Sequence, residues 1–474
     1  MTPVVSSTIH PPVLRGVASW PWYLHYVRDP LACLASAQRQ FGSLFALGNP
    51  LPFWTGGRRF VLAVGGRYNR VVLSQPDLFR PGGQVMKGPK GSAQHRIRGG
   101  IFSMRGDKHR THRRLMQPPF LKPSVAGYTT VMAGLIDQII DRWQPGEALD
   151  MYREMRTLSN WVAAHILFGN EDFAASIQIG KEIEEWLLLD VQARNSLAMV
   201  DLPGTAYARL LRQAERLERV MRSAIERNRR ATSPSDNVLS ILIRACDAHK
   251  SDMTETDLVA HAVILYAASF ETTANVLAWT FFLIAQHPSI AADLHDEIAQ
   301  GLKGWPPDSQ KLDALPLLNG VVNESMRLLP PVPYTFRTPD ETVDLGDFRL
   351  HAGDKVILSH YLTHRDPGIF PGPNRFDPKR WLKARPDPYE YIPFSAGPRL
   401  CLGISFALLE LKLTVARVMQ RFRFTVVPDA TIDGVIQLTL RPRQGIPMPV
   451  HTQDRAFAAA PVKGNIHGMV DLAG

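Results

Sequence analysis

The sequence predicts a mainly α-helical fold with a small β-rich part, and three observations predict it. Helical patterns fill the chain from about residue 125 to 300, and the run from Leu258 to about Gln286 is nearly all apolar. A second strong helical pattern, LGISFALLELKLTVARVMQRF, follows Cys401. Strand patterns are short: SLFALG and RFVLAVG, within residues 41–75, contain β-favouring residues and end at glycines.

The composition narrows the class of protein. The chain has 474 residues, 45% of them hydrophobic, which is enough to bury a large core. Its three cysteines, Cys33, Cys246 and Cys401, form no CxxC pair, so we expect neither a zinc knuckle nor a disulfide framework, and a reducing intracellular setting. The net charge of +10 fits a basic solvated surface, an acidic protein partner or a membrane surface. No nucleic-acid motif accompanies the charge, so we expect no nucleic-acid partner.

The N-terminal part and the long apolar run are the two places where a membrane segment could be predicted. Within the first thirty residues, prolines and basic residues interrupt every apolar run, so no secretory signal or membrane anchor is predicted. The long run carries Glu271 near its middle, and a bare carboxylate at a bilayer centre costs several kcal/mol. We therefore expect a cytoplasmic protein in which this helix crosses the core, begun by a capping box of Thr254 and Asp257.

Two pairs of residues share the spacing E-x-x-R, which places both charges on one helix face. Glu226 and Arg229 lie in an amphipathic pattern of mixed charge and are expected to form an exposed pair. Glu324 and Arg327 precede LLPPVP, whose prolines must end their helix. The proline-rich stretch of residues 331–382 that follows is expected to be a long coil. So long a coil inside a compact protein usually has a functional role.

The stretch FSAGPRLCLG, from Phe394 to Gly403, contains the cysteine that suggests chemistry. Cys401 stands at the start of the last predicted helix, where the helix dipole and free backbone N–H groups favour a thiolate. Gly397 and Gly403 allow close approach by backbone or by a flat ligand. Phe394 can shield the sulfur from water, and Arg399 can pair with an anion. A shielded thiolate beside an anion-binding arginine suits a haem, with sulfur on the iron and guanidinium on a propionate.

The spacing F-x-x-G-x-R-x-C-x-G resembles the haem-binding loop of the cytochrome P450 family, the haem-thiolate monooxygenases. The resemblance implies haem b as cofactor, with Cys401 as the axial ligand of its iron. It implies the family's mostly helical, triangular prism fold as a single domain over residues 15–450, followed by a loosely ordered tail over residues 451–474. Its β-rich parts are expected near residues 41–75, 335–360 and 422–450.

Further landmarks follow in the family's order, from about residue 20 to 448. Glu324, Arg327 and Arg380 resemble the family's glutamate–arginine pair locked to a third arginine, a structural role that holds the coil presenting Cys401. GDKHRTHRRLMQPPF and YTFRTPD resemble the segments that hold the haem propionates. The resemblance assigns this role to His109, Arg113 and Arg337, beside Arg399.

The long helix contains AASFETT, which resembles the family pattern Ala/Gly-Gly-x-Asp/Glu-Thr-Thr/Ser. By this resemblance Ala268 and Gly403 lie against the haem, Thr272 hydrogen-bonds the oxygen to be activated, and Glu271 relays protons from solvent. Ser269 stands where the family has a glycine, which is associated with a local opening of the helix. Serine is small and its hydroxyl can bond back to a carbonyl and bend a helix, so we expect the opening to survive.

The resemblance implies a monooxygenase that inserts one atom of O2 into an apolar small molecule, such as a fatty acid or terpenoid, by hydroxylation or epoxidation. A haem-thiolate isomerase or dehydratase and a non-catalytic haem sensor or ligand carrier remain alternatives. No G-x-G-x-x-G occurs, so electrons must come from a separate protein. We expect a monomer that meets an acidic ferredoxin or flavodoxin, with its reductase, through exposed cations on the haem-side face: Lys108, Arg110, Arg114 and Lys122.

Overall fold

The computed structural model describes residues 13–14, 19–47, 58–82, 86–169, 172–195, 200–230, 237–248 and 252–472. The chain forms two compact units, which are described in turn. Unit 1 comprises residues 1–84, 332–373 and 386–401. Unit 2 comprises residues 85–331, 374–385 and 402–474. The expected domain start at residue 15, and residues 48–57 of the first β-rich part, lie outside the described residues.

Unit 1 is built on a six-stranded sheet with the strand order β1-β2-β3-β9-β6-β4. The pairing of β3 with β9 is parallel and sets Phe60 opposite Lys355, so distant parts of the sequence share one sheet. This confirms the strands predicted within residues 41–75 and 335–360. The strands are β1 (Val13–Leu14), β2 (Leu44–Leu47), β3 (Phe60–Ala63), β4 (Phe79–Pro81), β6 (Tyr334–Pro339) and β9 (Lys355–Ser359).

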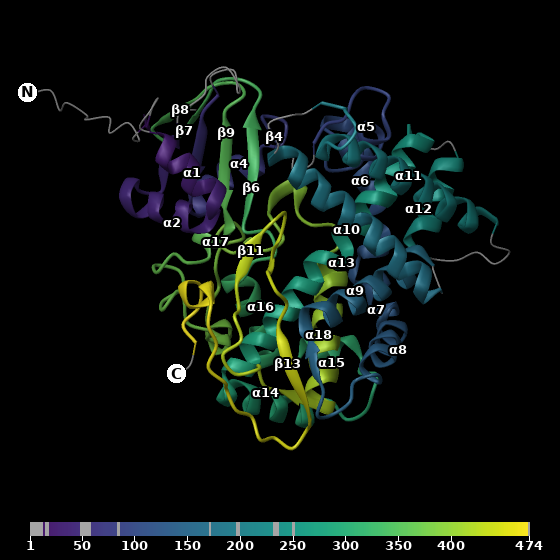
Figure 1. The fold of residues 1–474 in the computed structure, drawn as a ribbon, viewed down its shortest axis with the longest axis vertical. Helices are drawn as coiled ribbons and strands as arrows, with labels where there is room; N and C mark the ends of the chain where they lie inside the picture. Colours follow the sequence, from purple (N-terminus) through teal and green to yellow (C-terminus); the bar gives the residue numbers. More distant parts are fainter. Residues whose placement is uncertain are drawn as a thin grey trace, which may run out of the picture. The chain divides into compact units, whose positions relative to one another are not determined.

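One face of this sheet is covered because alternate residues of its strands, such as Val61 and Ala63 of β3, form a buried apolar cluster. Val61 and Val356 are fully buried, and they pack in one cluster with Val72 of helix α4. Figure 1 shows α1 and α2 beside the sheet. The remaining elements of unit 1 are α1 (Trp20–Arg28), α2 (Pro30–Phe41), α4 (Gly66–Ser74), β7 (Val343–Leu345), β8 (Phe348–Leu350), α17 (His360–Thr363) and the short 3-10 helix η4 (Gly397–Arg399).

Unit 2 is organised around the long helix α13 (Glu255–Gln286). Its predicted capping box is confirmed: the Thr254 side chain accepts from the Asp257 N–H, and the Asp257 carboxylate accepts from the Thr254 N–H. Every residue from Thr273 to Gln286 is buried. Since burial of one large apolar side chain stabilises by about 1.5–3 kcal/mol, packing within the protein is enough to hold this helix. No helix in the described part of the chain is both long enough and apolar enough for a membrane span.

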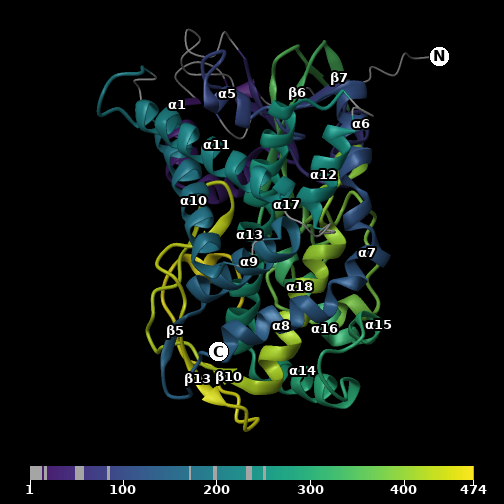
Figure 2. The ribbon, with the colours of Figure 1, turned by 90° about the vertical axis from the view of Figure 1, so that its right-hand side faces the viewer.

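Among the helices that pack against α13 inside unit 2 are α9 (Met151–Phe168), α16 (Pro316–Leu328) and α18 (Ile404–Arg421), which lie around it in Figure 2. They form the predominantly helical core that the sequence predicts. The other helices of unit 2 are α5 (Ala93–Ile97), α6 (Gly106–Met116), η2 (Pro118–Phe120), α7 (Lys122–Gly127), α8 (Thr129–Ile140), α10 (Phe173–Asn195), α11 (Ala206–Arg230), α12 (Val238–Asp247), α14 (Pro288–Gly301), α15 (Ser309–Asp313), η3 (Pro378–Leu382) and η5 (Asn465–Gly468).

Unit 2 also contains two small antiparallel sheets. One has the order β10-β13-β5, and the other is the hairpin of β11 and β12. They confirm the β-rich part predicted within residues 422–450, and the hairpin matters for the site below. The strands are β5 (Ala148–Asp150), β10 (Phe422–Phe424), β11 (Gly434–Ile436), β12 (Leu440–Pro442) and β13 (Pro447–Thr452).

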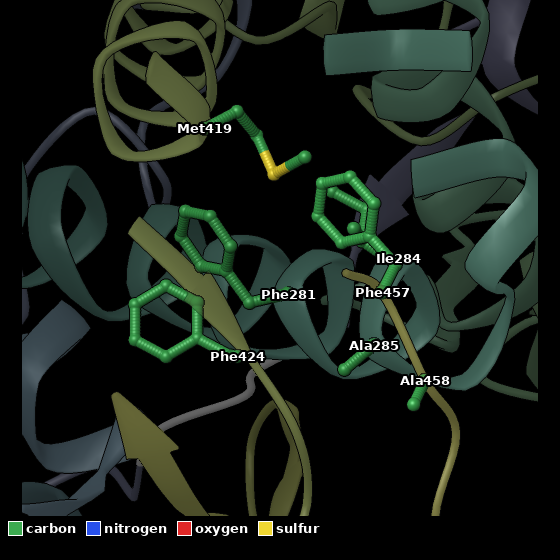
Figure 3. A pocket seen from close by; sticks show the side chains of 7 residues that line it. All are labelled: Phe281, Ile284, Ala285, Met419, Phe424, Phe457 and Ala458. Atoms are coloured by element: carbon green, nitrogen blue, oxygen red, sulfur yellow. The ribbon is translucent and has the colours of Figure 1, made fainter. Parts of the chain in front are cut away.

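The chain after β13 differs from the loosely ordered tail that we expected over residues 451–474. Ile466 and Val470 are buried, at 0% and 1% exposure. Phe457 and Ala458 reach α13 and help to line a small apolar void of about 10 Å³ (Figure 3). The tail is therefore held by hydrophobic contacts along the described part of its length. The void has no polar lining, and we interpret it as a packing gap of the core.

Candidate haem-thiolate and proton-relay residues

The loop before Cys401 is held by backbone geometry in unit 1. The Cys401 N–H donates to the Phe394 carbonyl, 2.9 Å away. Gly397 has a φ of +70°, and a Cβ there would lie 2.5 Å from the Leu73 carbonyl oxygen of α4. Only glycine fits so close an approach. The loop thus presses on α4 and presents an exposed Cys401, whereas Cys33 and Cys246 are buried.

The α18 helix begins later than the sequence predicted. Its N-cap is Gly403, so Cys401 lies two residues before the cap. A Cβ on Gly403 would meet only ring carbons of Phe120, at 4.0 Å. This glycine is therefore not required by the packing of the described residues, in contrast to Gly397.

Two of the predicted propionate ligands, Arg337 and Arg399, belong to unit 1 and lie close enough for their positive charges to interact. Arg337 on β6 is 9% exposed, and its guanidinium donates a hydrogen bond to the carbonyl of neighbouring Phe336, at 2.9 Å. Burial, together with the nearby positive charge of Arg399, lowers the pKa of Arg337 to about 10. Burial also lowers the pKa of His360 to about 3, with the charge of Arg337 adding to the effect, so this imidazole is neutral. A buried guanidinium beside a second, half-buried one favours an anion as their partner.

The other predicted propionate ligands lie in unit 2 on α6. His109 and Arg113 are one turn apart, as expected, and His109 is buried. Two contacts tie this helix to α13. His112 Nδ1 lies 2.8 Å from His261 Nε2, and Lys108 forms an ion pair with Asp257 at 2.9 Å.

The centre of α13 departs from one expectation. The helix runs without interruption through residues 268–273, so the opening expected at Ser269 is absent from this described helix. The Ser269 hydroxyl donates to the Tyr266 carbonyl at 2.9 Å, and that of Thr272 donates to the Ala268 carbonyl at 3.0 Å. These local bonds satisfy the hydroxyls within a continuous helix. Ala268 and Thr272, one turn apart, both retain accessible surface beside the fully buried stretch that follows.

Glu271 has a partner that the sequence did not reveal. The hydroxyl of Thr439, at the end of the β11–β12 hairpin, donates to Glu271 Oε1 at 2.7 Å. Burial raises the pKa of the Glu271 carboxyl, although this hydrogen bond and the charges of Arg156 and Arg441 oppose the rise. No local pattern marks Thr439 or the two arginines, because they come from elements far apart in the sequence.

A polar cavity of about 20 Å³ adjoins the Glu271 carboxyl in unit 2. Its walls come from α9, α10, α13 and the β11–β12 hairpin, and the space is sufficient for one water molecule. The lining residues are Tyr152, Arg156, Glu184, Leu187, Leu188, Val191, Glu271, Gln437, Leu438 and Arg441.

The predicted structural charge cluster is assembled in unit 2. Both oxygens of the Glu324 carboxylate are engaged: Arg327 donates to them at 2.8 and 2.9 Å, and Arg380 donates at 2.9 Å. The Trp381 indole and the Asp377 N–H complete the set, at 2.9 and 3.0 Å. Glu324 and Arg327 are fully buried. Such a pair is tolerated in a core only when its remaining hydrogen-bonding capacity is used, as here.

A further buried carboxyl was missed at the sequence level. Glu410 on α18 is 0% exposed, and burial raises its pKa to about 8, with the nearby Ser159 hydroxyl opposing the rise. A signal was present, because this acid stands inside the apolar pattern ALLELKL, much as Glu271 stands inside the long run.

Comparisons with known proteins agree on one family. The family model described as Cytochrome P450 matches residues 30–446. Cyclooctat-9-en-7-ol 5-monooxygenase of Streptomyces melanosporofaciens is 32% identical over 85% of this chain and 87% of its own. Cyclooctatin synthase of the same organism is 30% identical over 89% of this chain and 92% of its own. The structure of retinoic acid bound cyanobacterial CYP120A1 covers 94% of this chain and 99% of its own, with a TM-score of 0.78 and 24% identity, and it shows the same fold.

Proposed function

The chain belongs to the cytochrome P450 family and is a monooxygenase, and on this premise we propose that it inserts one atom of O2 into an apolar, terpenoid-like molecule. The observation that carries the proposal is the pair of adjacent residues Glu271 and Thr272 on α13, in which burial raises the pKa of the Glu271 carboxyl. Unit 1 separately contributes the exposed Cys401 thiol. Relatives that oxidise terpenoids support the substrate class, among them one that acts on the largely hydrocarbon alcohol cyclooctat-9-en-7-ol. Hydroxylation and epoxidation both fit this chemistry.

The family's cofactor is haem b, and the residues described here fit it. Haem supplies one-electron and dioxygen chemistry at its iron, and a thiolate ligand favours O–O cleavage. Cys401 is the candidate ligand, with Phe394 beside it as a shield. The buried Arg337 and the half-buried Arg399 fit the haem's carboxylates, since two neighbouring like charges call for an anion. From unit 2, the candidates for haem contact are His109, Arg113, Ala268 and Gly403.

Glu271 and Thr272 are proposed to manage protons and hydrogen bonds. Because burial raises the pKa of Glu271, its carboxyl holds a proton more readily than an exposed glutamate and can release it to a base. The Thr272 hydroxyl donates a hydrogen bond to the Ala268 carbonyl. By rotating, it can donate instead to another acceptor on the accessible face of α13. The two residues thus offer a proton source and an orienting hydroxyl on adjacent positions.

The electron donor is proposed to be an acidic ferredoxin or flavodoxin with its reductase. Arg114 and Lys122 are exposed on unit 2, as this requires. Lys108 is engaged with Asp257, and Arg110 pairs with Asp107 at 2.7 Å, so part of the predicted positive charge is compensated. Arg114 and Lys122 are therefore expected to contribute most to docking. The exposed charges act over about 8 Å at physiological salt, so reduction should slow as salt rises.

Carbon monoxide binding tests the cofactor assignment. Reduced wild-type protein under carbon monoxide should show the red-shifted Soret band of thiolate ligation, and Cys401→Ala should lose it. Cys246→Ala is the matched control, because Cys246 is buried on α12 in the other unit and should leave the band unchanged. Retention of the band in Cys401→Ala would overturn the assignment.

Product formed per NADPH consumed tests the reaction. Thr272→Ala should keep haem content and substrate affinity while more of the electrons end as hydrogen peroxide. Thr272→Ser, which keeps the hydroxyl, should recover most of the wild-type ratio. An isomerase, dehydratase or ligand carrier would consume no NADPH in step with product, and that outcome would refute the monooxygenase reaction for this chain.

A further inference from the structure

The β11–β12 hairpin is anchored so that its Thr439 hydroxyl has a defined position. The N–H of Leu440 donates to the Pro331 carbonyl at 2.9 Å, and the Trp279 indole of α13 donates to the Leu440 carbonyl at 3.2 Å. Arg441 bonds the Gln437 side chain through two of its nitrogens, at 3.0 and 2.6 Å, and closes the hairpin. Thr439 is 6% exposed. Its side chain is thus fixed against the same helix that carries Glu271.

Two arginines, Arg156 and Arg441, lie near Glu271, but their guanidinium groups hydrogen-bond to other side chains. Arg156 of α9 binds Glu184 of α10, with nitrogen–oxygen distances of 2.8 and 2.6 Å. Arg441 binds Gln437, and Tyr152 of α9 lies beside it. Among the described residues, the Thr439 hydroxyl is the hydrogen-bond partner of the Glu271 carboxyl. Both arginines favour the ionised form from a distance, and Glu184 opposes it.

A hydroxyl partner differs from an arginine partner in what it permits. A bidentate guanidinium holds a carboxylate ionised, because protonation would cost a charge-assisted hydrogen bond. A hydroxyl can donate to one carboxyl oxygen whether the other oxygen carries a proton or not. The bond from Thr439 to Oε1 therefore fixes the orientation of Glu271 and leaves Oε2 free to gain and lose a proton. The cavity beside this carboxyl can hold a single water. The side chain of Glu184, which also lines the cavity, is 35% exposed.

We propose that Thr439 is a positioning residue for proton delivery: it orients the Glu271 carboxyl over the cavity lined by Tyr152, Arg156, Glu184, Gln437 and Arg441, which admits protons from solvent. The inference deepens the proposed function and rests on Glu271 acting as a proton donor there. Each proton that leaves Glu271 Oε2 toward the Thr272 side is replaced from the cavity water, which is itself replenished with a proton from solvent. The carboxyl returns to its starting state after each cycle.

The test uses Thr439→Val, which keeps the shape of the side chain and removes the hydroxyl, in the intact enzyme with its electron donor. Turnover should fall about fivefold, which corresponds to one neutral hydrogen bond lost. The apparent pKa in the pH profile of turnover should move upward, because the hydroxyl favours the ionised carboxylate. Thr439→Ser should restore both values. Thr280→Val is the matched control, since Thr280 is a buried threonine of α13 whose hydroxyl bonds back to the Val276 carbonyl.

Glu271→Gln separates the failure of this inference from that of the proposed function. If Glu271→Gln slows turnover and removes the pH dependence while Thr439→Val behaves as wild type, the inference is wrong and the proposed proton donor stands. If Glu271→Gln has no effect on turnover, both are wrong. In the double variant, Thr439→Val should add no further loss, because both residues act on one proton route. A purely structural role would show as an unchanged pH profile in Thr439→Val, and that outcome would also overturn the inference.

Discussion

The same E-x-x-R spacing occurs twice in unit 2 and produces two different structures. In α16, Glu324 and Arg327 are fully buried, and Arg380 joins them from the short helix η3. In α11, Glu226 and Arg229 keep 50% and 25% of their side chains exposed. The spacing only places two charges on one helix face. Burial, which the spacing does not encode, decides whether the pair is a rigid structural element or one contact among several.

The exposed pair is also less isolated than the sequence suggested. Arg229 contacts Asp247 and Glu255 at 2.8 Å each, in addition to Glu226 at 3.2 Å. Arg229 therefore links α11 to α12 and to the first turn of α13, and these carboxylates raise its pKa. Glu226 is one of three partners, whereas Glu324 is the acceptor on which its whole cluster converges. The two glutamates should respond very differently to the same substitution.

The largest effect is expected from Glu324→Gln. The change leaves Arg327 and Arg380 buried without their counter-charge, and breaking a buried ion pair in this way costs about 3–5 kcal/mol. The free energy of unfolding, measured with urea, should fall by that amount, and the carbon monoxide band should weaken because the coil after α16 loses its anchor. Arg380→Lys, which keeps the charge but not the planar geometry, should give an intermediate loss. If Glu324→Gln unfolded at the wild-type urea midpoint, the buried ion pair would not stabilise the protein more than the exposed one.

A smaller, pH-dependent effect is expected at Glu410, a buried carboxyl with no described arginine beside it. Its pKa rises from 4.5 to about 8 in the folded protein, so the folded state retains a proton that the unfolded chain has released. Stability should therefore fall as pH rises from about 4.5 to about 8, by at most about 1.4 kcal/mol per pH unit, and level off above that.

Two variants isolate this titration. Glu410→Gln and Glu410→Met both remove the ionisable group, so each should become steadily more stable relative to wild type over the same pH range, whatever its offset at low pH. The measurement is the urea midpoint at several pH values. A difference that does not change with pH would show that Glu410 does not titrate between these limits.

What the sequence could predict follows from how local each signal is. The long apolar run, the capping box at Thr254 and the loop before Cys401 are contiguous, and they led to the correct fold class and family. The cluster of Glu324 with Arg380 could be placed by its resemblance to the family alone, because the two residues are not close in sequence. In the first three cases a short segment carries its own information.

The rest depended on contacts between distant segments. The Thr439 hydroxyl meets Glu271 across 168 residues of sequence, and nothing near either residue indicates the other. The expected opening at Ser269 was inferred from small size and from a back-bonding hydroxyl. The hydroxyl does bond to the Tyr266 carbonyl, but the helix is continuous there. The spaced apolar residues of the tail, such as Ile466, were a signal of burial that we did not use.

The smallest effect is expected from Glu226→Gln. An exposed ion pair contributes about 0–1 kcal/mol, and Arg229 retains Asp247 and Glu255 after the change, so the urea midpoint should scarcely move. The residual difference should shrink further in high salt, because exposed charges are screened. Arg229→Met is the matched variant: it removes all three contacts at once and should cost more than Glu226→Gln while remaining below Glu324→Gln. If Glu226→Gln were as costly as Glu324→Gln, burial would not be what distinguishes the two pairs, and the E-x-x-R spacing itself would carry the stabilisation.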